Sequence, residues 1–197
     1  PAGEVEVRLD ETVSRLKVKI ERIQPFLTFR PLLRSYVVWA VTPEGEFENI
    51  GELEIDGEKA ELETVTRLQR FGILITAEPH FMVDRPNSTV AFTSRPPLND
   101  KVRIGTASVE TGLMDYSAIN LPPQGALPPR VVQARMAFKV AEQEGAEKLA
   151  EVAFRRARVA IDSMEQLLRR SMPLDVLLPY TNDVIRLAHR ATKLALA

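Results

Sequence analysis

The sequence of 197 residues contains no cysteine, which excludes disulfide bonds, thiolate catalysis and iron–sulfur ligation. Its 26 Lys and Arg nearly balance 27 Asp and Glu, so there is no overall basic field that would attract a nucleic-acid backbone. The longest apolar runs, residues 36–41 and 71–77, are far shorter than the roughly 20 residues of a membrane-spanning helix. We therefore expect no nucleic-acid partner and no transmembrane segment.

Residues that could build a catalytic or metal site are also scarce. The two histidines, His80 and His189, lie in different segments, whereas a zinc site needs three or four ligands at short spacings. The nine glycines are scattered singly, so no phosphate-binding loop occurs, and no Gly-x-Ser-x-Gly nucleophile motif is present. We therefore predict a protein that is not an enzyme and that holds no cofactor and no metal.

The first half of the chain has the alternation of β-strands. Val5, Val7 and Leu9 alternate with charged residues, and so do the apolar residues of 16–20, which indicates strands with one solvated face. Turn sequences such as residues 43–45 and 56–57 separate about seven or eight such runs, a spacing typical of an antiparallel sandwich. We predict an immunoglobulin-like β-sandwich, with Trp39 buried between its two sheets.

The second half changes character. Residues 98–129 are rich in proline and predict a semi-rigid linker arm. Residues 130–197 are rich in Ala, Glu, Arg and Leu and predict a small helical bundle or hairpin. We expect helices up to residue 144, over 146–170, and from about 181, because Pro173 and Pro179 should interrupt the chain. The predicted fold class is thus all-β plus all-α: a β-sandwich domain (1–97), a linker (98–129) and an α-helical domain (130–197).

Two groups of residues are candidates for binding a protein partner. The arm carries apolar side chains that are too numerous for a solvated tether, and such strips usually mark a contact surface. These are Val109, Leu113, Met114, Tyr116, Ile119, Leu121 and Leu127. In the helical half, Arg155 and Arg156 lie off the apolar stripe of their helix and are predicted to form a charged docking surface. The alternative for these arginines is an ordinary solvated helix face.

Several segments resemble a known group of proteins. In the first half they are residues 36–45 (YVVWAVTPEG), 49–53 (NIGEL) and 71–79 (FGILITAEP). In the helical half they are residues 134–137 (ARMA) and 145–148 (GAEK). With these segments, most of residues 30–197 resembles an uncharacterised family of Gram-negative bacterial envelope proteins. The first half is also similar, more distantly, to the extracytoplasmic domain of anti-sigma-K factors.

The resemblance implies an extracytoplasmic, non-enzymatic protein. We predict a periplasmic, peripheral binding or scaffold protein, an accessory subunit docked on the periplasmic face of a membrane complex such as a photosynthetic or electron-transfer assembly. Two alternatives stay open: an extracytoplasmic sensor or regulatory domain of anti-sigma type, and a carbohydrate-binding module that uses Trp39 or Tyr36. The sequence contains neither the lipidation cysteine nor the signal peptide that such proteins often carry, which leaves its anchoring open.

Overall fold

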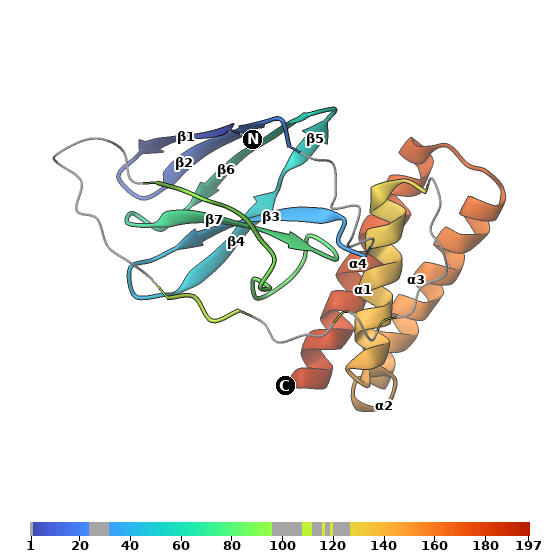
Figure 1. The fold of residues 1–197 in the computed structure, drawn as a ribbon. Coiled ribbons are helices and arrows are strands. Elements are labelled where there is room, and N and C mark those ends of the chain that lie inside the picture. The colour runs from blue at the N-terminus through green and yellow to red at the C-terminus, as the bar shows by residue number, and fades with distance from the viewer. Residues whose placement is uncertain (1, 24–31, 96–107, 112–115, 117–118, 120–126) are drawn as a thin grey trace, which may run out of the picture. The chain divides into compact units, whose positions relative to one another are not determined.

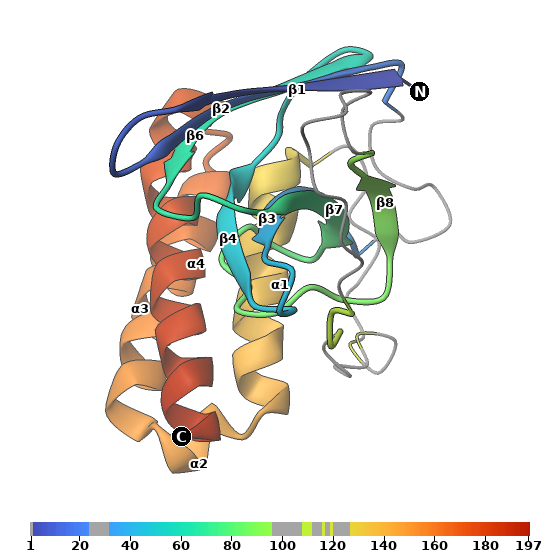
Figure 2. The same ribbon diagram turned by 90° about the vertical axis from the view of Figure 1, so that its left-hand side faces the viewer.

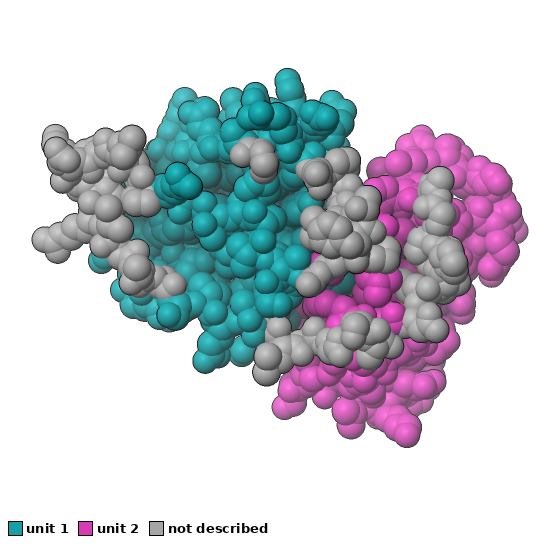
Figure 3. Space-filling model, viewed as in Figure 1, with its two compact units in different colours: residues 1–30, 35–113 teal, residues 31–34, 114–197 magenta. Residues whose placement is uncertain are grey.

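The computed structural model describes residues 2–23, 32–95, 108–111, 116, 119 and 127–197. The chain divides into two compact units, which Figure 3 shows in teal and magenta. The first comprises Pro1–Arg30 with Ser35–Leu113, and the second comprises Pro31–Arg34 with Met114–Ala197. The segment predicted as a linker, residues 98–129, is therefore shared between the two units.

The first unit contains two antiparallel sheets of four strands each, which lie in two layers (Figure 1). One sheet has the order β1-β2-β6-β5. Its strands are β1 (Ala2–Leu9), β2 (Ser14–Glu21), β5 (Glu54–Asp56) and β6 (Lys59–Thr66). The other sheet has the order β4-β3-β7-β8. Its strands are β3 (Ser35–Val41), β4 (Phe47–Glu52), β7 (Gly72–Glu78) and β8 (Val90–Thr93). The predicted antiparallel β-structure of the first half is thus confirmed.

The two sheets meet along β6 and β4. The Thr66 hydroxyl donates a hydrogen bond to the Glu48 carboxylate at 2.5 Å. Gly51 has a φ of +138°, and a Cβ at this position would lie only 3.0 Å from the Leu62 side chain, so the close approach requires glycine. Gly51 pairs with Val38, which identifies the face of β3 that is turned toward the β1-β2-β6-β5 sheet.

Strand β3 is buried at every position, because its second face is covered as well. Trp39 lies on this second face in a cluster with Val37, Val41 and Leu74. Phe47, Val83 and Val109 pack against the cluster from outside the strand. Trp39 is fully buried, as predicted. The prediction that it lies between the sheets is wrong, because adjacent residues of a strand point to opposite faces and its neighbour Val38 is the one that faces the other sheet.

The second unit contains α1 (Pro129–Gln143), α2 (Ala146–Leu149), α3 (Glu151–Arg169) and α4 (Leu174–Leu196). Helix α4 packs against both α1 and α3 (Figure 2), and its fully buried Ala188 and Ala191 allow the helix axes to approach closely. Helices α1 and α3 are joined by a bidentate ion pair from Arg135 to Glu165, at 2.7 and 2.9 Å. None of the described helices has the apolar length needed to cross a bilayer.

Two helix boundaries differ from those expected. Helix α4 begins at Leu174 rather than near residue 181, with Pro173 as its N-cap residue and Pro179 inside the helix. A proline in the second turn removes few helical hydrogen bonds, and burial of Leu177 and Thr181 offsets that loss. The helix expected over 146–170 consists of α2 and α3, which are separated by the non-helical Ala150 with a φ of −137°.

Replacing the tryptophan tests the packing of the second face of β3. Trp39→Ala should lower the free energy of unfolding by about 3–5 kcal/mol, since a large buried ring leaves a cavity that the sheet cannot fill. Val90→Ala on β8 is the control, because this half-exposed side chain should contribute less than about 1 kcal/mol. The measurement is urea-induced unfolding followed by far-ultraviolet circular dichroism, and equal losses in the two variants would contradict the packing.

Candidate functional site

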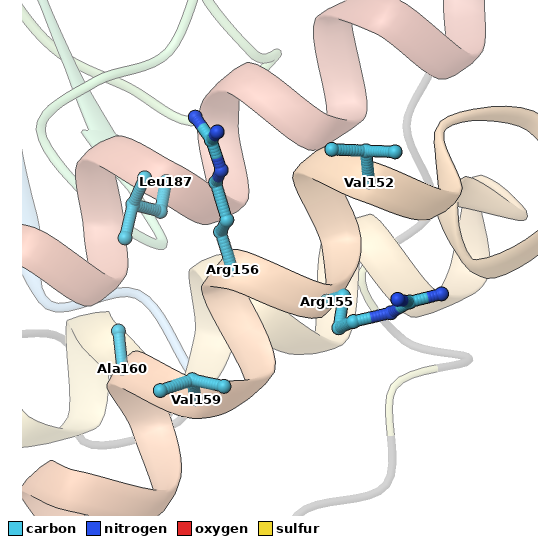
Figure 4. A pocket seen from close by; sticks show the side chains of 6 residues that line it. All are labelled: Val152, Arg155, Arg156, Val159, Ala160 and Leu187. Carbon is cyan, nitrogen blue, oxygen red and sulfur yellow. The ribbon is translucent and has the colours of Figure 1, made fainter.

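A groove on the surface of the second unit lies between α3 and α4 (Figure 4). It has a volume of about 460 Å³ and opens to solvent. The side chains that line it are Val152, Arg155, Arg156, Val159, Ala160 and Leu187. Four of these six side chains are apolar and two are cationic, and none is a carboxylate. The groove therefore offers an apolar floor with positive charge beside it.

Two valines of α3 make this groove unusual. The core-facing side of α3 is formed by Phe154, Ala157 and Met164, which are buried. Val152 and Val159 lie on the other side, and they are 67% and 63% exposed. An exposed valine has a lower helix propensity than Lys or Glu and gains no burial in return. These two side chains are thus poorly explained by the stability of the helix alone.

Helix α4 continues the apolar surface. Leu187 is half-buried and lines the groove. Tyr180 and Leu194 stand seven residues before and after it, so they lie on the same side of α4. Both are large and exposed, at 42% and 51%. The apolar surface therefore extends along α4 beyond the groove itself.

The positive charge of the groove depends on which arginines of α3 are already engaged. The guanidinium of Arg158 lies over the rings of Phe138 and Phe154, 5.2 and 5.1 Å from their centroids. It also forms an ion pair with Glu142 at 3.4 Å. Arg158 thus links α1 to α3, and its charge is already paired with Glu142.

The other two arginines belong to the groove. Arg155 forms an ion pair with Glu151 one turn earlier on the same helix, and this pair is exposed. Arg156 forms no ion pair with any residue that the structure describes. Figure 4 shows its side chain extending toward α4, whereas Arg155 points away. Arg156 is therefore the cation best placed to meet an anionic group above the apolar floor.

The structure places the predicted partner-binding residues in different surroundings. Arg155 and Arg156 come together at the groove. Val109 packs against the Trp39 cluster, and Tyr116 and Ile119 form a cluster with Met136 and Val140 of α1. Leu127 is half-buried, and Leu113, Met114 and Leu121 lie outside the described residues. Packing within the chain accounts for the burial of Val109, Tyr116 and Ile119, and a role for the arm in partner binding stays a prediction.

A second polar feature, which was not predicted, lies at the end of β7. The carboxyl group of Glu78 is fully buried and accepts a hydrogen bond from the Thr76 hydroxyl at 2.5 Å. The backbone N–H and the side-chain amide of Asn87 donate two more, each at 2.9 Å. The Thr76 hydroxyl in turn accepts a hydrogen bond from the Trp39 indole at 2.8 Å. This cluster joins the core of the sheet to the segment that follows β7.

Burial in this cluster raises the pKa of Glu78 to about 7, and the hydrogen bonds from Thr76 and Asn87 oppose part of that rise. A carboxyl group with such a pKa is a candidate acid or base, but this one is enclosed by protein. The alternation along β7 places Glu78 on the same face as Leu74 and Thr76, and this parity is the sequence pattern that could have revealed it. In the part of the chain that the structure describes, no three His, Asp or Glu side chains form a potential metal site.

No family model, no curated protein and no solved structure matches this chain. Its function is therefore inferred from the geometry and chemistry of its own residues.

The buried carboxyl group of Glu78 predicts how stability depends on pH. Below about pH 4.5 the group is protonated in both the folded and the unfolded chain. As the pH rises toward 7 the unfolded chain ionises first, so the folded state loses about 3 kcal/mol of stability across this window. Glu78→Gln should remove this part of the slope.

Urea unfolding of the wild type and of the Gln variant near pH 5 and near pH 8 provides the measurement. The difference between the two proteins isolates Glu78 from the other titrating groups. The same pH slope in both proteins would show that Glu78 ionises as freely in the folded chain as in the unfolded one.

Proposed function

We propose that this protein is a non-enzymatic binding protein whose helical unit docks on a protein partner through the groove between α3 and α4. The observation that carries the proposal is the pair of exposed valines, Val152 and Val159, next to Arg156. An apolar helix of the partner would bury the valines, and a carboxylate on that helix would pair with the guanidinium.

The shape of the site favours a helix over a flat surface. Two antiparallel helices leave a furrow between them, and amphipathic helices bind in such furrows through residues spaced by three and four. The absence of carboxylates from the lining means that an acidic helix meets no like charge there. The partner we propose is thus an amphipathic helix that carries Asp or Glu beside its apolar face.

The first unit, in this proposal, is an immunoglobulin-like scaffold. Its strand orders β1-β2-β6-β5 and β4-β3-β7-β8 support this. In immunoglobulin domains one sheet joins strands A, B, E and D, and the other joins C, F and G with an added C′ strand beside C. Numbering the eight strands A, B, C, C′, D, E, F and G reproduces both orders.

We further propose a periplasmic, peripheral location, as an accessory subunit on a larger membrane complex. The support for this part is the resemblance of residues 36–45, 71–79 and 145–148 to bacterial envelope proteins. A carbohydrate-binding role would need an exposed aromatic platform, whereas Trp39 and Tyr36 are buried. The enclosure of Glu78 likewise supports a role without catalysis.

Affinity purification from native membranes in mild detergent tests the proposal. The tagged wild type should retain one stoichiometric membrane complex. Val152→Asp combined with Val159→Asp should lose that complex, because two carboxylates then stand in the apolar groove beside the partner's acids. Both positions are exposed, so thermal unfolding of this variant should match that of the wild type.

Val90→Asp is the matched control, since it places the same charge at an exposed valine of the first unit. It should retain the complex. Retention by the groove variant would show that the partner docks elsewhere, and the absence of any stoichiometric partner of the wild type would contradict a binding function.

A further inference from the structure

Strand β1, at the edge of its sheet (Figure 1), differs from the other edges of the first unit. Within the described strands the two sheets have four edges: β1, β5, β4 and β8. Strand β5 has three residues and β8 has four, while the pairings of β4 and of β8 are each interrupted by a register shift. Short or bulged strands protect sheet edges from pairing with other chains.

Strand β1 is longer and more regular. It pairs with β2 over eight consecutive residues without a bulge, and it contains no proline. Seven of its eight residues are exposed, so no described segment covers this edge. Within the described sheet no strand lies beyond β1, and one row of its backbone N–H and C=O groups therefore faces outward. Strand β1 is thus a template on which one more strand can pair.

The inner face of β1 is apolar and only partly covered. Val5 and Val7 stand opposite Val18 and Leu16 of β2, which are buried, so they continue the apolar layer of the sheet outward. Val7 is nevertheless 44% exposed, and Leu9 is 62% exposed. Apolar side chains on an added strand would cover this surface.

The outer face of β1 carries three charged side chains, Glu4, Glu6 and Arg8. Glu6 is engaged within the chain, because it stands opposite Lys17 and forms an ion pair with Lys19 at 3.9 Å. Glu4 stands opposite the same Lys19 but forms no ion pair with any described residue. The carboxylate of Glu4 is therefore available to a cation outside the chain.

Arg8 has a like charge as its neighbour. It stands opposite Arg15 of β2, and the charge of Arg15 is met by Asp10 at 3.0 Å. Arg8 itself forms no ion pair with any described residue. A carboxylate beside Arg8 would supply an attraction that β2 does not, since like charges on opposite residues of a sheet repel. Strand β1 thus presents one unengaged charge of each sign, four residues apart on the same face.

These two charges are complementary to each other across a two-fold axis. Antiparallel pairing of β1 with β1 of a second copy, centred on Glu6, sets residues 3–9 of one copy against residues 9–3 of the other. The axis is perpendicular to the sheet, so the outer face of one copy continues into the outer face of the other. In this register Glu4 stands opposite Arg8 of the second copy, and the symmetry forms this pair twice.

The inner face fits the same register. Val5 stands opposite Val7 of the other copy, again twice, and Leu9 stands opposite Gly3 and diagonal to Val5. Each copy thereby covers apolar surface that the other leaves exposed. Apolar contacts on one face and opposite charges on the other thus call for one alignment of the two strands.

The one unfavourable contact lies on the axis, where Glu6 meets Glu6. The ion pair of each Glu6 with Lys19 of its own chain offsets this repulsion. Moving the centre of the pairing by one residue toward the N-terminus sets Glu4 against Glu6 twice. Moving it by one residue toward the C-terminus pairs Glu6 with Arg8 but retains only residues 5–9, so the register centred on Glu6 is the one that combines length with opposite charges.

We propose that β1 pairs with β1 of a second copy of this chain, which joins the two β1-β2-β6-β5 sheets into one antiparallel sheet across a two-fold axis. A strand with only basic residues on its outer face would set a like charge against Arg8, whereas a second copy meets both Glu4 and Arg8 with opposite charges. The interface is small, so the association is weak. It is separate from the groove of the helical unit, and either can exist without the other.

Sedimentation velocity of the full chain at rising concentration measures the dimer. Arg8→Glu places a carboxylate opposite Glu4 at both ends of the pairing, and Glu4→Arg places a guanidinium opposite Arg8. Each substitution turns two attractions into two repulsions and should raise the dissociation constant at least about tenfold. Both side chains are exposed, so thermal unfolding of the variants should match that of the wild type.

Mixing the two variants should restore the dimer. In a mixed dimer one chain is basic at both positions and the other is acidic at both, so the two facing pairs attract again. An equimolar mixture, with a fluorescent label on one variant, should form this dimer with a dissociation constant within about threefold of the wild-type value. A chain with both substitutions should also dimerise like the wild type, because its two opposite charges only exchange places.

The matched controls are Glu58→Arg and Lys59→Glu. They make the same two changes of net charge at exposed side chains where β5 turns into β6, away from the β1 edge. Neither should change the dissociation constant by more than about twofold. Hydrogen exchange of the ¹⁵N-labelled wild type locates the contact, since alternate amides of Ala2–Leu9 should exchange more slowly as the protein concentration rises.

Three results would overturn the proposal. A wild type that stays monomeric up to about 1 mM would exclude a second copy as the occupant, because even weak interfaces associate at that concentration. A dimer that is undiminished in Arg8→Glu and in Glu4→Arg, or that protects amides other than those of β1, would place the contact elsewhere. A mixture of the two variants that stays monomeric would show that these side chains do not face each other.

Discussion

Strand β3 has to be covered by apolar groups on both faces, and much of the first unit follows from this constraint. One face lies against the β1-β2-β6-β5 sheet, where Gly51 permits the approach of Leu62. The other face carries Trp39, and it is closed by Val83 and Val109, which come from segments outside the sheet. A strand buried on both faces is a nearly continuous apolar run, which explains why residues 36–41 stand out in the sequence. The same second face also contains Thr76 and Glu78, so a polar network is enclosed with the tryptophan.

In the helical unit the central element, covered on two sides as β3 is, is α4, which packs on both α1 and α3. The alanines of α4 are buried in the core of this unit, and so is much of the stack that Phe138 forms with Phe154, whose ring centroids are 5.1 Å apart. The large apolar side chains that stay exposed outside the two cores are informative, because burial does not explain them. Val152 and Val159 on α3, and Val7 and Leu9 on β1, are apolar side chains that packing within the chain does not use. Val152 and Val159 lie in one groove with Arg155 and Arg156, and this combination of apolar and charged groups is what directs a partner to a defined place.

The local patterns of the sequence predict much of this structure. Alternation of apolar and charged residues identifies β1 and β2, and the Asp56-Gly57 turn separates β5 from β6. The spacing of Phe154, Ala157 and Met164 by three and seven residues identifies the core side of α3. The predictions fail where contacts between residues far apart in the sequence determine the structure. Alternation assigns Trp39 to one face of its strand but does not tell which face meets the other sheet. Burial of Leu177 outweighs the interruption by Pro179, and Val109 and Ile119 find apolar partners that no local pattern shows. At the groove, the sequence predicts Arg155 and Arg156 as binding residues. The exposed valines on either side of them can be recognised as part of the site only from the packing of α3 on α4.

The central claim is that Val109, Tyr116 and Ile119 of the arm belong to the two cores, whereas the apolar residues of the α3–α4 groove are reserved for a partner. Hydroxyl-radical footprinting with mass spectrometry, on the isolated protein and on its native assembly, tests this claim most directly. In the isolated protein Val152 and Val159 should react rapidly, and Val109 and Ile119 should react slowly, in keeping with their exposure and burial. The assembly should then protect Val152 and Val159 and leave Val109 and Ile119 unchanged. Rapid reaction of Val109 and Ile119 in the isolated protein, with protection only in the assembly, would show that the arm is the docking surface and would contradict the account.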